Sequence, residues 1–204
     1  MITRLFKWFA RSTPRRYRRG NPHNYRRARF IISLSALGFL GALILALLFC
    51  GPLPFAAGAI LCLLGALMYG VIPLILQATS LDVAGHFLVL TFFCLTGCIN
   101  YAIGGWSGPL LIWYAFLPAM SALVTSARWA MLWSALVVAQ MIGLHWLHAH
   151  GFDQPKLSAS EIEVLSALSI LGFLAALLIL TFLYEKFESQ IIRRLQRNNR
   201  ELAQ

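Results

Sequence analysis

The sequence predicts an all-α, polytopic membrane protein with six transmembrane helices and both chain ends on the cytoplasmic side. Of the 204 residues, 59% are hydrophobic and only 12% are charged, whereas a soluble domain carries about 25% charged residues. Long apolar runs alternate with short breaks. Several of these runs have the ~20-residue length that a helix needs to cross a ~30 Å hydrocarbon core.

Six apolar segments qualify as spans, and each is bounded by turn-forming or polar residues. The first follows the basic run RRYRRGNPHNYRRAR, and the second follows the tight turn GPLP. The expected spans are 30–50, 55–76, 81–103, 110–124, 129–147 and 164–183. The fourth is short, so we expect it to include residues of the preceding turn or to lie shallow in the membrane.

The basic residues favour one orientation of these spans. Ten of the 17 Lys and Arg residues lie in the first 29 positions and five follow Tyr184, which leaves only Arg128 and Lys156 between them. Cytoplasmic segments of membrane proteins are enriched in Lys and Arg. Six spans place the basic arm, the tail and Arg128 together on the cytoplasmic side, so a nucleic-acid partner is not needed to explain the charge.

The stretch GGWSGP between the third and fourth spans predicts a sharp turn on the outer side. Gly104 and Gly105 permit a turn too tight for side chains, and Pro109 suits the start of a helix. Aromatic residues flank this turn, and Trp and Tyr favour the membrane interface. Two interpretations remain: an interfacial aromatic belt, or the roof of a small-molecule pocket. The candidate ligand-binding residues are Tyr101, Trp106, Trp113, Tyr114 and, in the fifth span, Gln140.

Ionisable residues at membrane depth are candidates for function. His86 lies one helical turn after Asp82 near the cytoplasmic end of the third span. The two could form a pH-sensitive pair, because a neighbouring carboxylate changes the protonation of an imidazole. The alternative, which we favour, is an interfacial pair in which Asp82 contacts Arg128 from the adjacent cytoplasmic turn.

A metal or haem site is a weaker hypothesis. His145, His148 and His150 cluster where the fifth span ends, but no accompanying ligand motif is present. Cys94 and Cys98 share a helix face, where small buried thiols are commoner than soft-metal ligands. We therefore expect no cofactor and no metal. The sequence contains no phosphate loop, nucleophile elbow or paired intramembrane acids, so these residues are not expected to form an enzyme.

The two ends differ in pattern. Residues 1–12 place apolar and basic side chains on opposite helical faces, which predicts a short helix on the membrane surface within the basic arm, 1–29. After the bundle, 30–184, the last span can continue without a breaker through 185–204. There Ile191, Leu195, Asn198 and Leu202 repeat at spacings of four, three and four, as at the start of a coiled coil.

Together these features resemble the membrane-integral input domains of bacterial sensor histidine kinases and of some diguanylate cyclases. The likeness covers roughly residues 30–204, and its motif residues are Gly104, Gly105, Pro109, Trp113 and Pro118. Ile103 and Gly108 replace the Thr and Ser that are common in that motif. The resemblance implies a multi-pass protein of the bacterial inner membrane. It further implies a homodimer, with a kinase or cyclase domain downstream in the same chain.

The resulting hypothesis is a sensor module that binds a small apolar or amphipathic, lipid-like signal beneath the GGWSGP turn. Binding would favour one of two bundle packings, and the last helix would carry the change to the cytoplasm. The rivals are a small-solute transporter, a membrane haem or metal protein, and a self-standing membrane scaffold. A transporter would need a polar path or inverted repeats, and the sequence contains neither a midplane charge nor a convincing repeat.

Overall fold

The structure is a computed structural model that describes residues 14, 17, 22–53, 55–152 and 157–202, with side chains described up to Ser189 except at residues 22, 107 and 186. The surface helix expected over residues 1–12, and the side chains of the expected coiled-coil positions, lie outside the described part. The elements are α3 (Pro22–Cys50), α4 (Ala56–Ala78), α5 (Leu81–Ile103), the 3-10 helices η1 (Gly105–Ser107) and η2 (Leu111–Ala115), α6 (Phe116–Val124), α7 (Ala127–Ala149) and α8 (Ala159–Leu202).

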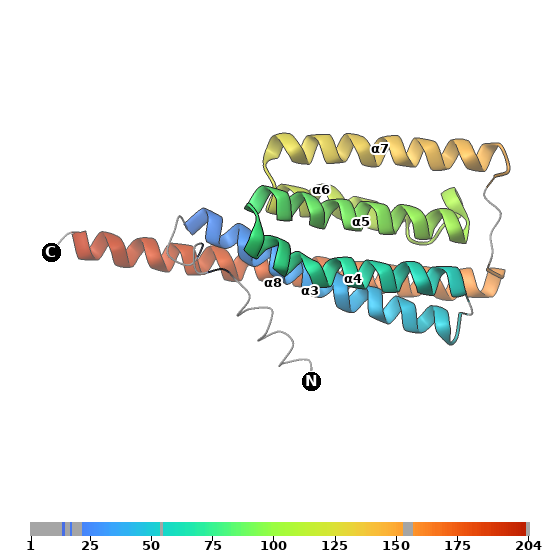
Figure 1. The fold of residues 1–204 in the computed structure, drawn as a ribbon, viewed down its shortest axis with the longest axis horizontal. Coiled ribbons are helices and arrows are strands. Elements are labelled where there is room, and N and C mark those ends of the chain that lie inside the picture. Colours follow the sequence, from blue (N-terminus) through green and yellow to red (C-terminus); the bar gives the residue numbers. More distant parts are fainter. Residues whose placement is uncertain (1–13, 15–16, 18–21, 54, 153–156, 203–204) are drawn as a thin grey trace.

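The expected all-α, polytopic fold is confirmed. The helices run side by side as an elongated bundle, and the described residues contain no strand (Figure 1). Five helices are long and apolar enough to cross a membrane, namely α3, α4, α5, α7 and α8. The apolar helical segment between α5 and α7, Leu111–Val124, is shorter.

Helices α3 and α8 are longer than the spans expected within them. Helix α3 begins at Pro22, in the basic arm, where a proline suits the first helical turn because it lacks the N–H that would stay unpaired there. Helix α8 begins beside Ser158, whose backbone N–H donates to Glu161 Oε2 at 2.7 Å, while the Glu161 N–H donates back to Ser158 Oγ at 3.4 Å. This reciprocal capping box fixes the start of the 44-residue helix α8.

The turn after α5 has the tightness that its glycines suggest. Gly104 and Gly105 adopt φ values of 136° and 56°, a region that residues with a Cβ rarely enter. Pro109 lies in the turn that precedes η2, two residues before Leu111. The chain therefore reverses over residues 104–110 and enters η2 without a long loop.

The short segment η2–α6 returns along almost the whole length of α5. At the turn, a Cβ on Gly108 would lie 2.6 Å from Asn100 Oδ1, near the end of α5. At the other end, a Cβ on Gly85, near the start of α5, would lie 2.6 Å from the carbonyl oxygen of Val124. The 3-10 turns of η2 lengthen this segment, because a 3-10 helix rises about 2.0 Å per residue and an α-helix only about 1.5 Å.

The core lies where α3, α4, α5 and α6 meet, and it includes the fully buried Ile31, Ile72, Leu88 and Leu117. Helix α7 packs on one side of this core and buries only Trp133, Val137 and Leu144. Helix α8 packs beside α3 and η2 and continues well past the rest of the bundle (Figure 1). Because α7 and α8 bury so little, most of their surface remains for lipid or for other chains.

Candidate functional site

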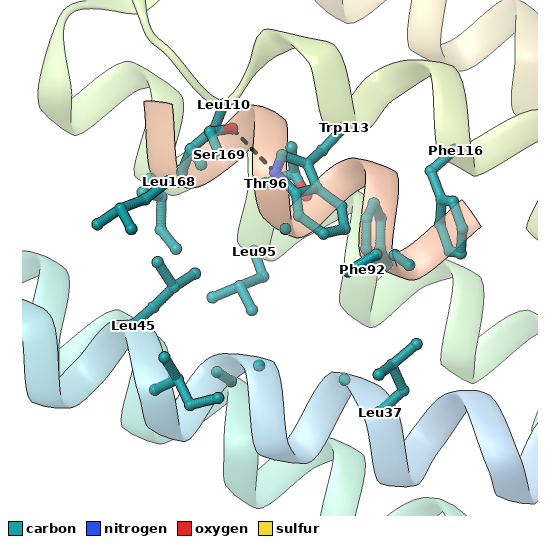
Figure 2. Close-up of a pocket in the computed structure, with 18 of the residues that line it drawn as sticks. Leu37, Leu45, Phe92, Leu95, Thr96, Leu110, Trp113, Phe116, Leu168 and Ser169 are labelled. Atoms are coloured by element: carbon teal, nitrogen blue, oxygen red, sulfur yellow. Dashed lines mark hydrogen bonds between the residues drawn. The ribbon is translucent and has the colours of Figure 1, made fainter. Parts of the chain in front are cut away.

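A cavity of about 300 Å³ lies between α3, α5, the η2–α6 segment and α8, with Tyr69 of α4 at one wall (Figure 2). Helix α3 contributes a face that includes Gly38 and Gly41, and α8 contributes a face that includes Gly172 and Ala176. Small residues on both facing helices leave the space unfilled. Among the described residues, no charged side chain lines the cavity. An occupant must therefore be uncharged where it contacts the walls, because burying an unpaired charge in an apolar site is costly.

Trp113 is the residue that connects this cavity to α8. Its indole Nε1–H donates to Ser169 Oγ at 3.0 Å, as the dashed line in Figure 2 shows. Its ring lies edge-on to Phe173 at 5.9 Å and 89°, and its ring atom Cζ2 lies 3.3 Å from the position that a Cβ on Gly172 would take. Contacts over two successive turns of α8, at Ser169, Gly172 and Phe173, thus depend on one side chain of η2.

Three uncharged polar side chains interrupt the apolar walls: Tyr69, Thr96 and Ser169. Tyr69 packs its ring against Gly38, whose Cβ position lies 2.7 Å from the ring atoms Cε1 and Cζ, so α3 and α4 approach closely here. The Ser169 oxygen already accepts the Trp113 N–H. The cavity can therefore hold an apolar molecule and offer it a few hydroxyl groups.

Of the five aromatic and amide residues predicted to form a site, only Trp113 lines the cavity. Tyr101 is 49% exposed on the surface of α5. Trp106 lies edge-on to His145 of α7, with ring centroids 5.0 Å apart. Tyr114 is buried on the side of η2 toward α5, and Gln140 Nε2 occupies the space over Gly97. The structure therefore places the cavity on the α3–α8 side of Trp113 rather than directly beneath the aromatic turn.

Buried polar groups gather near the end of α5. Asn100 is fully buried, and neither its side-chain nitrogen nor its oxygen has a hydrogen-bond partner within the described structure. Among the described residues, the Tyr114 hydroxyl and Gln140 Oε1 are likewise buried without a hydrogen bond of ordinary geometry, although the Tyr114 hydroxyl lies close to the Asn100 side chain. Sequence reasoning singled out Tyr114 and Gln140 but missed Asn100, although an asparagine inside an apolar span is itself a signal.

Asp82 contacts Arg27 of α3, not Arg128 as expected. The Arg27 guanidinium donates to Asp82 Oδ1 at 2.6 Å and to the carbonyl oxygen of Val124 at 3.0 Å. Arg27 thus joins the starts of α3 and α5 to the end of α6. The separation in sequence is 55 residues from Arg27 to Asp82, so the partner depends on how the helices are arranged around the bundle.

We expect Arg27→Ala to destabilise the protein more than Asp82→Ala does. The Arg27 side chain is 13% exposed and Asp82 is 62% exposed, so loss of Arg27 leaves the Val124 carbonyl unpaired as well as breaking the ion pair. The expected costs in unfolding free energy are about 1.5 kcal/mol for Arg27→Ala and below about 1 kcal/mol for Asp82→Ala. Unfolding by SDS in mixed micelles measures both. A larger loss from Asp82→Ala would contradict this assignment.

His86 contacts two tryptophans of α7 instead of Asp82. The Trp133 indole donates to His86 Nδ1 at 3.2 Å, and the Trp129 ring lies edge-on to the imidazole at 4.6 Å. An indole nitrogen can only donate, so His86 Nδ1 is the acceptor in this hydrogen bond. In the part of the chain described, the hydrogen bonds of Asp82 and His86 are to Arg27 and Trp133, and a pH-sensitive pair of Asp82 and His86 stays a prediction.

Trp133→Phe is expected to lower the unfolding free energy by about 1 kcal/mol, because it leaves a partly buried acceptor on His86 without its donor. Trp129→Phe is the matched control, since it keeps an aromatic ring beside the imidazole and removes no described hydrogen bond to His86. Thermal or SDS unfolding of the two variants compares them directly. Equal losses would show that the His86–Trp133 hydrogen bond contributes nothing measurable.

His145 and His150, near the end of α7, have separate contacts. His145 meets Trp106, whereas the His150 ring lies 4.3 Å from that of Trp146 and its Nδ1 is 2.8 Å from the Trp146 carbonyl oxygen. Among the described residues, no group of three His, Cys, Asp or Glu side chains is arranged to hold a metal ion. Cys94 and Cys98 are exposed on α5 rather than buried between helices.

Comparison with known proteins does not identify the chain. No protein-family model matches it, and no curated protein or solved structure is found similar to it. The apolar helices indicate a membrane protein, and the resemblance to sensor input domains remains a prediction.

Proposed function

We propose that the protein is the membrane-embedded input module of a bacterial signalling protein of the sensor histidine kinase type. A small apolar or amphipathic signal binds in the cavity beside Trp113, and α8 passes the resulting change out of the bundle. The observation that carries this proposal is the position of Trp113, which lines the cavity and also binds Ser169 of α8. An occupant that moves the indole must also strain its contacts with α8.

Helix α8 is attached to the bundle at two described places, and these suit a relay. Trp113 holds its first half through Ser169 and Phe173. Further along, the ring of Phe187 lies edge-on to Phe30 of α3 at 4.9 Å, and the Arg29 guanidinium lies 5.5 Å from the same ring. The first attachment forms part of the cavity wall, and the second lies past Ile179, where the α8 wall of the cavity ends. An occupant can therefore displace α8 at the first attachment while the second stays in place.

The proposed topology has six passes, with both ends on the cytoplasmic side of a bacterial inner membrane. Support comes from the contacts of the short segment, because Val124 lies beside Gly85 and accepts a hydrogen bond from Arg27. The η2–α6 segment therefore returns to the level at which α5 began. Phe187 similarly lies level with Phe30, near the start of α3. Both ends then leave on the side that carries the basic residues.

The output is proposed to be a kinase or cyclase domain downstream in the same chain, acting in a homodimer. Support comes from the length of α8, whose 44 residues span roughly 66 Å at 1.5 Å per residue. That is about twice the ~30 Å thickness of a hydrocarbon core. A single helix of this length can connect a site within the membrane to a cytoplasmic domain.

A chimera tests this function. The chain is fused after Gln204 to the catalytic region of a histidine kinase and reconstituted in phosphatidylcholine vesicles. Gly41→Leu fills the cavity from α3, where a Cβ meets no atom within 4 Å. Gly143→Leu is the matched control, because its Cβ is equally unobstructed and it lies on α7 outside the cavity. We expect Gly41→Leu alone to change the autophosphorylation rate, by about fivefold or more. Equal rates in both variants would contradict the relay.

A further inference from the structure

We propose that the occupant of the cavity is an acyl chain of the surrounding bilayer, which enters sideways between α3 and α8. This inference takes the cavity of the proposed function as its site and names the ligand. The module would then respond to the lipids around it, instead of to a solute that arrives from water.

The shape of the cavity is the first support. Its walls run from Leu34 to Leu48 along α3 and from Leu165 to Ile179 along α8, which is roughly 21 Å on each helix at 1.5 Å per residue. A volume of about 300 Å³ spread over that length describes a narrow cleft parallel to the helices. Such a cleft suits a single linear chain, and bilayer acyl chains lie in this same direction.

The exposure of the rim is the second support. Ile44 of α3 is 58% exposed, Leu168 of α8 is 40% exposed and Ile179 of α8 is 41% exposed, yet all three line the cavity. The cavity thus opens on the outer surface of the bundle, along the gap between these two helices. Both are among the helices apolar enough to cross a membrane. Within the membrane the medium around these helices is hydrocarbon, so the mouth of the cavity opens toward acyl chains.

The chemistry of the walls is the third support. All lining residues are uncharged, and the polar ones are limited to the hydroxyl groups of Tyr69, Thr96 and Ser169 and the Trp113 indole. The indole nitrogen and the Ser169 oxygen already bind each other. No cluster of donors or acceptors is left to select a polar molecule, whereas a methylene chain needs none.

Quenching of Trp113 fluorescence by brominated lipids tests this inference. A variant that keeps Trp113 as its only tryptophan, with the other five changed to Phe, is reconstituted in phosphatidylcholine brominated at the middle of the acyl chain. The reference is the same lipid without bromine. Quenching of Trp113 is expected, and Gly41→Leu is expected to abolish most of it, because the added side chain lies halfway along the α3 wall. A second variant keeps only Trp146, which is 54% exposed on α7, and its quenching should be unchanged by Gly41→Leu.

The inference is overturned if bromine does not quench Trp113, or if Gly41→Leu leaves that quenching intact. Circular dichroism checks that the single-tryptophan variants keep their helices. If these variants unfold, the chain with all its tryptophans is labelled with fluorotryptophan and studied by ¹⁹F NMR in the same two lipids. Bromine should shift the Trp113 signal, and Gly41→Leu should abolish that shift. The quenching reports occupancy alone. Quenching without a change in the kinase chimera would therefore keep the lipid site and reject the signalling function.

Discussion

Trp113→Ala is expected to lower the unfolding free energy by about 3 kcal/mol, the lower end of the range for a large aromatic side chain, because the indole is half-buried and borders the cavity. The indole contacts Phe92 and Phe116 as well as Phe173, so its loss opens a hole between η2, α5 and α8. It also removes the hydrogen bond to Ser169. Unfolding in SDS-containing micelles measures the loss. Labelling of a cysteine introduced at Leu171 should additionally show a more mobile α8.

Trp106→Ala is the matched control for this experiment. Trp106 lies in η1, just before η2, but it is 37% exposed and its described ring contact is with His145 of α7. We expect a loss below about 1.5 kcal/mol, because much less apolar surface is buried. If the two variants lost equal stability, Trp113 would have no special part in holding α8. Membrane insertion should remain intact in both.

Gly85→Leu is expected to destabilise the protein by about 3 kcal/mol, at the upper end of the range for overpacked interiors. A Cβ at this position would lie 2.6 Å from the carbonyl oxygen of Val124. Because that neighbour is backbone, it can move only if the end of α6 moves away from α5. The Arg27 hydrogen bond to the same carbonyl should then be lost as well. Stability in micelles and hydrogen exchange at residues 121–125 measure these effects.

Gly97→Leu and Gly143→Leu calibrate that result. At Gly97 the obstructing atoms belong to the Gln140 side chain, which can rotate away, so the cost should be smaller than at Gly85. At Gly143 no atom lies within 4 Å of the Cβ position, and the substitution should be neutral or slightly stabilising because glycine is a poor helix former. Losses in a different order would contradict the close approach of α5 and α6.

The helices were largely predictable from sequence because the requirement to cross a membrane is simple. The span expected over 81–103 coincides with α5, since Ser80 caps its start and Gly104 ends it. The start of α3 was placed too late. Arginine-rich sequence was treated as a separate arm, although Arg is a good helix former and Pro22 can begin the helix.

The cavity was less predictable, and the reason is physical. Trp113 was found because an aromatic residue near a turn is visible in the sequence. The opposite walls include Gly41, which leaves open space, and Gly38 and Gly172, which make room for the rings of Tyr69 and Trp113. Which residues face a glycine depends on which helices face each other. The partner of Asp82 likewise depends on which helices lie side by side. Arg128 was favoured as its partner from the predicted topology, whereas Arg27 was brought to it by the packing of α3 against α5.

The most direct test of the account is whether a change in the cavity moves α8. Spin labels at Arg26 of α3 and Glu188 of α8, in a variant lacking the native cysteines, report the distance between the two helices beyond the cavity. We predict that Gly41→Leu shifts the distance distribution measured by double electron–electron resonance, whereas Gly143→Leu leaves the distribution as in the parent protein. Superimposable distributions in all three proteins would contradict the coupling between cavity and helix, and with it the proposed sensor function.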